Sequence, residues 1–330
     1  MNDYVQYAGQ AGALDPQAVD ELQAMAQGGN SEAPDLLTLR DAMGWPARDI
    51  HTRRMTIRNQ IIDGHVNVRI YRCDEDKAPT PGILFLHGGG FFGGSLDNVE
   101  YPCRALADLG ALTVVSVDYA LAPERPYPAA LLDCYAALRW LYLHADEYGV
   151  DKRQIVVAGD SAGGNLSLTT ALLDAMLGTH YLSRIVGYYP ATTLIVEDAL
   201  TDTTQYPAQQ HKALIDGYLN GFYGSMGMVA QWYAGAVECR NPLISPLYAD
   251  PTLLAALPPM LICCGEFDPL RLQVDAFVEK ARQAGADVTA IRYNGMVHAF
   301  MDKVGVLPQT EALLKDTVAF IHQTPVTPIA

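Results

Sequence analysis

The sequence predicts an α/β fold built on a mostly parallel sheet of eight strands, with helices on both faces. Short apolar runs of strand length recur along the chain and alternate with helical patterns, which is typical of parallel sheets. From the third run onward the strands are almost wholly apolar, as expected when both faces are buried. With 330 residues and no stretch of linker composition, we expect one large domain.

Each element follows from this pattern. The expected strands are 55–62, 66–71, 82–86, 112–117, 155–159, 185–189, 260–264 and 288–293. The first two, joined by Asp63-Gly64, predict an antiparallel hairpin at one edge. The expected helices are 17–27, 34–42, 129–148, 165–177, 274–284 and 310–322.

One segment, from 191 to about 243, interrupts this rhythm. Insertions after strand ends are where such a sheet builds its binding site. We expect most of the large side chains in this segment simply to pack it onto the domain. They are Tyr206, Tyr218, Phe222, Tyr223, Met226, Met228, Trp232 and Tyr233.

A formal net charge of −15 argues against nucleic acid or an anionic membrane as a partner, because both attract basic surfaces. Residues 1–30 carry no lysine or arginine, and no stretch is apolar enough to span a bilayer, so we expect a cytoplasmic protein. The cysteines lack the spacing of metal sites and predict reduced core thiols and no bound metal. They are Cys73, Cys103, Cys134, Cys239, Cys263 and Cys264.

The segment 159–163, Gly-Asp-Ser-Ala-Gly, lies between an apolar strand and a helical stretch. In a nucleophile elbow, a serine on a sharp strand-to-helix turn is raised above the sheet, and small residues two before and two after it let the turn close. Ser161 is therefore the candidate nucleophile.

A serine hydroxyl needs a base to remove its proton and an acid to orient that base. His298 follows the last strand and Asp268 follows the strand before it, so both come at carboxyl ends of strands in the order Ser, Asp, His. Glu266 and Asp275 are the alternatives for the acid, although Asp275 falls within a helix. The other histidines lack that order or position: His51, His65, His87, His144, His180, His211 and His322.

The tetrahedral intermediate of acyl transfer also needs hydrogen-bond donors for its oxyanion. The glycines after His87 allow backbone N–H groups to approach a substrate closely, and the residue after the nucleophile adds another N–H. We expect an oxyanion hole formed by Gly88, Gly89, Gly90 and Ala162, with His87 anchoring the loop.

Several motifs in the right order resemble the hormone-sensitive-lipase family of esterases (bacterial family IV), from about residue 55 to the end. The motifs are 87–91 (HGGGF), 119–124 (YALAPE), 127–130 (YPAA), 159–164 (GDSAGG), 268–270 (DPL) and 295–298 (GMVH). The resemblance implies an α/β-hydrolase fold, a single domain over 1–330 and no cofactor. It further implies a helical cap to which 1–50 and about 191–243 contribute.

By this resemblance, Ser161, Asp268 and His298 form the triad. Gly89, Gly90 and Ala162 furnish the oxyanion hole, with Gly88 shaping the turn. Three residues depart from the family pattern: Ala120 stands where Arg is usual, Leu272 where Asp is common and Ala299 where Gly is frequent. None of these changes removes a reacting group.

The resulting hypothesis is a serine carboxylesterase that hydrolyses small esters with short, acetyl-like acyl chains through an acyl-enzyme. An amidase or deacetylase with the same triad is one alternative. A non-catalytic small-ligand receptor is another, since plant gibberellin receptors resemble this family but lack the catalytic histidine, whereas His298 is present here. Relatives often pair through an edge strand or the last helix, here 288–293 and 310–322, which favours a homodimer.

Overall fold

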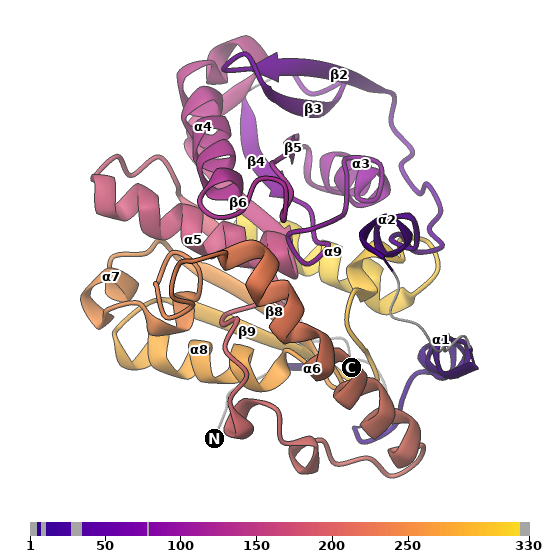
Figure 1. Ribbon diagram of the computed structural model, residues 1–330. Helices are drawn as coiled ribbons and strands as arrows, with labels where there is room; N and C mark the ends of the chain where they lie inside the picture. The colour runs from indigo at the N-terminus through magenta and orange to yellow at the C-terminus, as the bar shows by residue number, and fades with distance from the viewer. Residues whose placement is uncertain (1–4, 8–10, 28–34, 78, 324–330) are drawn as a thin grey trace.

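The computed structural model describes residues 5–7, 11–27, 35–77 and 79–323. One twisted sheet runs through it, with strand order β1-β9-β8-β7-β6-β4-β5-β3-β2 (Figure 1). The strands are β1 (Val5–Tyr7), β2 (Met55–Ile62), β3 (Val66–Cys73), β4 (Thr80–Leu86), β5 (Thr113–Asp118), β6 (Val150–Asp160), β7 (Arg184–Tyr188), β8 (Met260–Gly265) and β9 (Val288–Tyr293). The eight expected strands are β2 to β9, so the α/β prediction is confirmed.

The short strand β1 was not predicted. It pairs in parallel with β9, so β9 is not an edge of the sheet. The expectation that 288–293 is an edge strand through which two copies could pair is therefore wrong for this structure.

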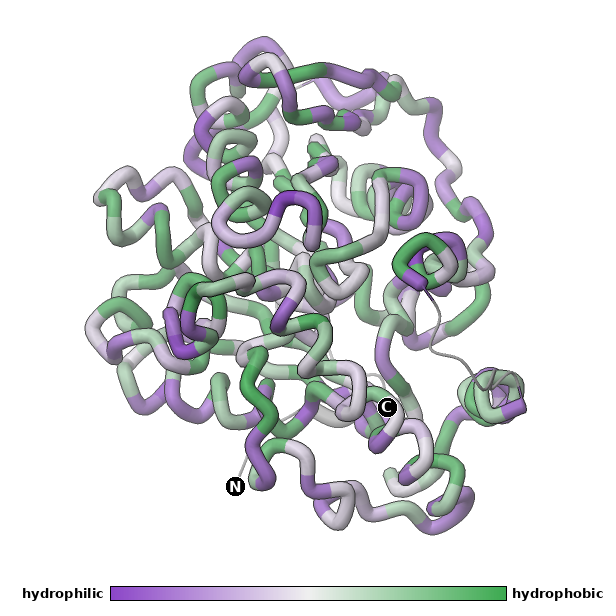
Figure 2. The backbone as a smooth tube through the Cα atoms, viewed as in Figure 1, coloured by the Kyte–Doolittle hydropathy of each residue, from purple (hydrophilic) through white to green (hydrophobic). Residues whose placement is uncertain are grey.

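Strands β2 and β3 form the predicted antiparallel hairpin at the other edge. Asp63 and Gly64 turn the chain with φ of 48° and 77°, the left-handed conformation of both central residues in a type I′ turn. Figure 2 shows hydrophilic and hydrophobic residues interleaved along this hairpin, as expected for strands with one face turned to solvent.

Helices cover both faces of the sheet (Figure 1). On one face α3 (Glu100–Gly110), which was not predicted, packs against α9 (Pro308–Ile321). On the other face lie α4 (Ala129–Leu143), α5 (Ala162–Leu177), α7 (Pro251–Ala255) and α8 (Arg271–Gln283), each in contact with the next.

The parallel pairing brings the ends of distant strands together. Leu86 at the end of β4 lies opposite Gly159 of β6, so the glycine loop and the elbow start side by side. Gly265 at the end of β8 lies opposite Tyr293 of β9, which sets the loops with Asp268 and His298 next to each other.

The N-terminal helices α1 (Pro16–Gln27) and α2 (Leu36–Asp41) and the long α6 (Lys212–Ala234) lie outside the sheet and its covering helices (Figure 1). Helix α1 packs on α6, and the two share a second apolar cluster. That cluster also takes in Phe267 and Val297, the neighbours of Asp268 and His298 in sequence. Packing of these outer helices is thus connected directly to the two loops.

Two sequence expectations about composition can be compared with the structure. The six cysteines are free thiols, and all but Cys239 are buried. Among the described helices, none combines the length and hydropathy needed to cross a membrane.

Candidate active site

Ser161 occupies the sharp turn between β6 and α5, with φ of 54° and ψ of −114°. A positive φ is strained for a residue with a Cβ, and such strain persists only where the surroundings fix it. Here the Ser161 N–H donates to the carbonyl of Tyr188 at 2.9 Å, and the Ser161 carbonyl accepts from the N–H of Asn165 at 3.0 Å. The turn therefore has the backbone geometry expected of a nucleophile elbow.

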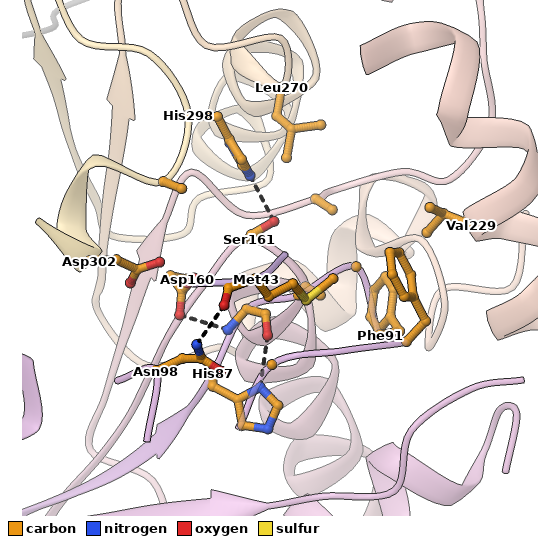
Figure 3. A pocket seen from close by; sticks show the side chains of 18 of the residues that line it. Met43, His87, Phe91, Asn98, Asp160, Ser161, Val229, Leu270, His298 and Asp302 are labelled. Carbon is orange, nitrogen blue, oxygen red and sulfur yellow. Dashed lines mark hydrogen bonds between the residues drawn. The ribbon is translucent and has the colours of Figure 1, made fainter. Parts of the chain in front are cut away.

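A continuous hydrogen-bonded chain links serine, histidine and aspartate. His298 Nε2 lies 2.8 Å from Ser161 Oγ (Figure 3), and His298 Nδ1 lies 2.8 Å from Asp268 Oδ2. The side chain of Asp268 is fully buried, and that of His298 is 12% exposed. A buried carboxylate on Nδ1 favours the tautomer whose Nε2 can accept a proton from the serine.

The loop that carries Asp268 is held from several directions. Asp268 Oδ1 accepts the N–H of Leu270 at 2.7 Å, and the Tyr206 hydroxyl donates to the Asp268 carbonyl at 2.9 Å. The Tyr223 hydroxyl donates to the carbonyl of Pro269 at 3.1 Å. Leu272 stands where the family commonly has Asp, but the loop is still anchored, because tyrosines of the inserted segment bind the loop backbone.

The backbone of His298 is held as well. Its N–H donates to the Tyr218 hydroxyl at 3.2 Å, and its ring meets the edges of the rings of Tyr189 and Phe222. Ala299 follows with φ of 59°, the left-handed conformation that explains why glycine is frequent there in the family. Sequence reasoning did not find the part that Tyr206 and Tyr218 play, since no motif marks them.

The alternatives for the acid do not contact His298 in the structure. The Glu266 carboxylate accepts the N–H groups of Gly12 at 2.6 Å and Gly295 at 2.9 Å, so it joins the N-terminal segment to the histidine loop. Asp275 lies on α8 and pairs with Arg292 at 3.0 Å. Of these three carboxylates, only that of Asp268 contacts His298.

The glycine loop is fixed to the elbow by Asp160. The Gly88 N–H donates to Asp160 Oδ1 at 2.8 Å, so this N–H is already used and cannot serve a substrate oxygen. The inclusion of Gly88 among the oxyanion donors is therefore corrected to a supporting role. The backbone N–H groups of Gly89, Gly90 and Ala162 border the pocket and have no acceptor among the described residues.

His87 lies at the start of this loop and is completely buried. Its Nδ1 is 2.7 Å from the Gly88 carbonyl, and its ring stacks on Tyr119 at 4.2 Å between centroids. Burial lowers the pKa of His87, which keeps the imidazole neutral. These contacts agree with the expected role of a loop anchor.

A pocket of about 380 Å³ opens over Ser161. Two segments distant in sequence border it: Met25 and Trp45 come from the N-terminal part of the chain, and Phe222 and Met226 come from α6. Of the large side chains in the inserted segment, Tyr206, Tyr223 and Tyr233 are buried in packing, whereas Met228 is exposed. No group of three or more potential metal ligands occurs within the described ranges.

Two substitutions of Asp160 test whether its carboxyl group supports catalysis by anchoring the glycine loop. Asp160→Ala removes the acceptor for the Gly88 N–H, and we expect kcat for p-nitrophenyl acetate to fall by about tenfold to a hundredfold, because the oxyanion donors lose their support. Asp160→Asn keeps an oxygen acceptor and should remain within a few fold of the parent protein.

The thermal unfolding midpoint serves as the control for this pair. Burial raises the pKa of Asp160, since the charged form is poorly solvated there, so the neutral Asn variant should be at least as stable as the parent. An Asn variant as inactive as the Ala variant would rule out this anchoring role.

This chain is similar to known esterases in sequence and in fold. A family model described as the alpha/beta hydrolase fold matches residues 83–302. Esterase LipI of Mycobacterium tuberculosis is 35% identical over 261 residues, covering 78% of each chain. An ethyl acetate hydrolase of Pseudomonas putida is 30% identical over 264 residues, covering 79% of this chain and 80% of that one.

Among solved structures, a hyperthermophilic esterase of Pyrobaculum calidifontis superposes with a TM-score of 0.79 and 30% identity, covering 96% of this chain and all of its own. The family match extends over most of the sheet and over the loops with Ser161, Asp268 and His298. This chain belongs to the α/β-hydrolase-fold family, in the branch similar to hormone-sensitive lipase.

Proposed function

We propose that this carboxylic ester hydrolase works through an acyl-enzyme formed on Ser161. The observation that carries the proposal is the pair of 2.8 Å contacts that join Ser161 to His298 and His298 to Asp268. Ser161 Oγ attacks the ester carbonyl carbon while His298 Nε2 takes its proton. The same proton then goes to the departing alkoxide, and Asp268 stabilises the imidazolium in between.

Water completes the cycle in the second half of the reaction. His298 removes a proton from the water, hydroxide attacks the acyl carbon, and the proton returns to Ser161 as the carboxylic acid leaves. The negative oxygen of both tetrahedral intermediates accepts hydrogen bonds from the free N–H groups of Gly89, Gly90 and Ala162. We assign these three groups as the oxyanion hole.

We propose further that α1, α2 and α6 form a cap on a single domain, and that the cap limits the substrate to small esters with short acyl chains. Side chains from these helices and the segments beside them close a pocket of about 380 Å³, which is near the lower end for small-molecule sites. The name of the related ethyl acetate hydrolase supports a short acyl chain. We also propose a cytoplasmic location, which the six free cysteines support.

A series of p-nitrophenyl esters from acetate to laurate tests the chain-length proposal. We expect kcat/KM to be highest at acetate or butyrate and to fall by about tenfold or more towards laurate, because a pocket of about 380 Å³ cannot accommodate a long acyl chain. Highest activity on laurate would contradict the short-chain assignment. A folded protein inert on every ester would instead support the amidase or receptor alternatives.

A further inference from the structure

The two sides of the pocket over Ser161 differ in polarity. Figure 3 shows Asp302 and Asn98 on one side of Ser161 and Phe91 and Val229 on the other. Asp302 ends a short helical turn, Phe300–Asp302, that begins two residues after His298. A carboxyl group therefore borders the pocket in the same loop that supplies the histidine.

Asp302 is partly exposed, and Figure 3 shows its carboxyl directed towards the middle of the pocket. Its Oδ1 is buried, yet it accepts no hydrogen bond from any of the described residues. Buried polar atoms in folded proteins are almost always hydrogen-bonded, and leaving one without a partner costs about 1–3 kcal/mol. The carboxyl of Asp302 borders the pocket, so a donor that arrives with the substrate can supply the partner that this oxygen lacks.

The neighbouring donors are already engaged. Asn98 donates its amide to the carbonyl of Met43 at 3.3 Å. The Lys303 ammonium pairs with Glu21 and lies 4.4 Å from the centre of the Trp45 ring. No described side chain thus satisfies Asp302 Oδ1.

The charges around Asp302 also affect the state of its carboxyl. Burial, reinforced by the negative charge of Asp160, raises the pKa of Asp302 well above its ordinary value. A carboxyl that keeps its proton for this reason still accepts a hydrogen bond at its other oxygen. An apolar substrate group placed beside Asp302 would leave this acceptor unpaired, so this side of the pocket discriminates against such a group.

We propose that Asp302 is a specificity-determining residue that accepts a hydrogen bond from a hydroxyl group of the substrate, so that hydroxylated short-chain esters are preferred over their methyl analogues. The inference rests on the proposed esterase function of the same pocket. Phe91 and Val229 on the opposite side of the pocket provide an apolar surface for the rest of the ester.

Matched esters that differ only by hydroxyl against methyl test this proposal. On the acyl side, each enantiomer of methyl 3-hydroxybutyrate is compared with methyl 3-methylbutyrate, and on the alcohol side 2-hydroxyethyl butyrate is compared with propyl butyrate. We expect the parent protein to favour the hydroxyl ester of at least one pair by about tenfold in kcat/KM, the usual effect of one hydrogen bond to an acceptor that otherwise stays unpaired.

Substitutions then assign the preference to Asp302. In Asp302→Leu, and in the smaller Asp302→Ala should the leucine variant not fold, the ratio of hydroxyl to methyl kcat/KM should fall to one or below. Asp302→Asn keeps an oxygen acceptor and should restore part of the ratio. Val229→Ala, on the opposite side of the pocket, is the matched control. It should change absolute rates while leaving the ratio of hydroxyl to methyl kcat/KM unchanged.

Hydrolysis of p-nitrophenyl acetate by the parent protein separates the two proposals. If that ester is cleaved but no pair shows a hydroxyl preference, or if the preference persists in Asp302→Leu and Asp302→Ala, the role of Asp302 is refuted and the esterase proposal stands. If p-nitrophenyl acetate is not cleaved at all, the esterase proposal fails first.

Discussion

Ser161→Ala is expected to lower kcat for p-nitrophenyl acetate by about 10⁴-fold to 10⁶-fold. The substitution removes the atom that forms the proposed acyl-enzyme, while His298 and Asp268 keep their own contact. Residual hydrolysis would come from substrate binding and from the N–H groups of the proposed oxyanion hole acting on water.

The fold should survive this change, because Ser161 Oγ contacts only His298 Nε2 among the described residues. We therefore expect the thermal midpoint of Ser161→Ala to equal that of the parent or to rise slightly. Residues that act as one unit are not additive, so adding His298→Ala to Ser161→Ala should cost almost no further activity. A further hundredfold loss in the double variant would show that His298 acts independently of Ser161, against the proposed mechanism.

The sequence was sufficient to predict the core of the fold and the three residues of the hydrogen-bonded chain. Ser161 lies in a local strand-turn-helix pattern, and Asp268 and His298 each follow an apolar strand. Parallel pairing places the carboxyl ends of such strands at one edge of the sheet, so local position along the chain was enough to predict spatial proximity.

Other features could not be predicted because they depend on contacts between distant segments. Helix α3 has a proline in its first turn and no side-chain cap at its start, so its sequence carries a weak helical signal. The Glu266 carboxylate reaches Gly12 across 254 positions, and no spacing rule describes that contact. Asp302 likewise belongs to no motif, and only the structure shows that its carboxyl meets the pocket.

Gly163→Ala is expected to be the most damaging of the small changes near the elbow, lowering the free energy of unfolding by about 3 kcal/mol or more. A Cβ at this position would lie 1.9 Å from the Leu86 carbonyl oxygen and 2.5 Å from that of His87. Both are backbone atoms that lead into the glycine loop, so neither can move aside without displacing the loop. Activity should therefore fall together with the urea midpoint.

Gly217→Ala is the matched control, because the same substitution should here raise the free energy of unfolding instead of lowering it. Gly163 lies in the first turn of α5, whereas Gly217 lies in the interior of α6, where alanine is intrinsically favoured by about 1 kcal/mol. At Gly217 no atom of the described residues, apart from its chain neighbours and the backbone of its own helix, lies within 4 Å of the added methyl group. The propensity gain is therefore unopposed and the urea midpoint should rise. If both variants lost stability equally, the close approach to Leu86 could not be the cause. Opposite signs would show that Gly163 is required for the contact between elbow and glycine loop.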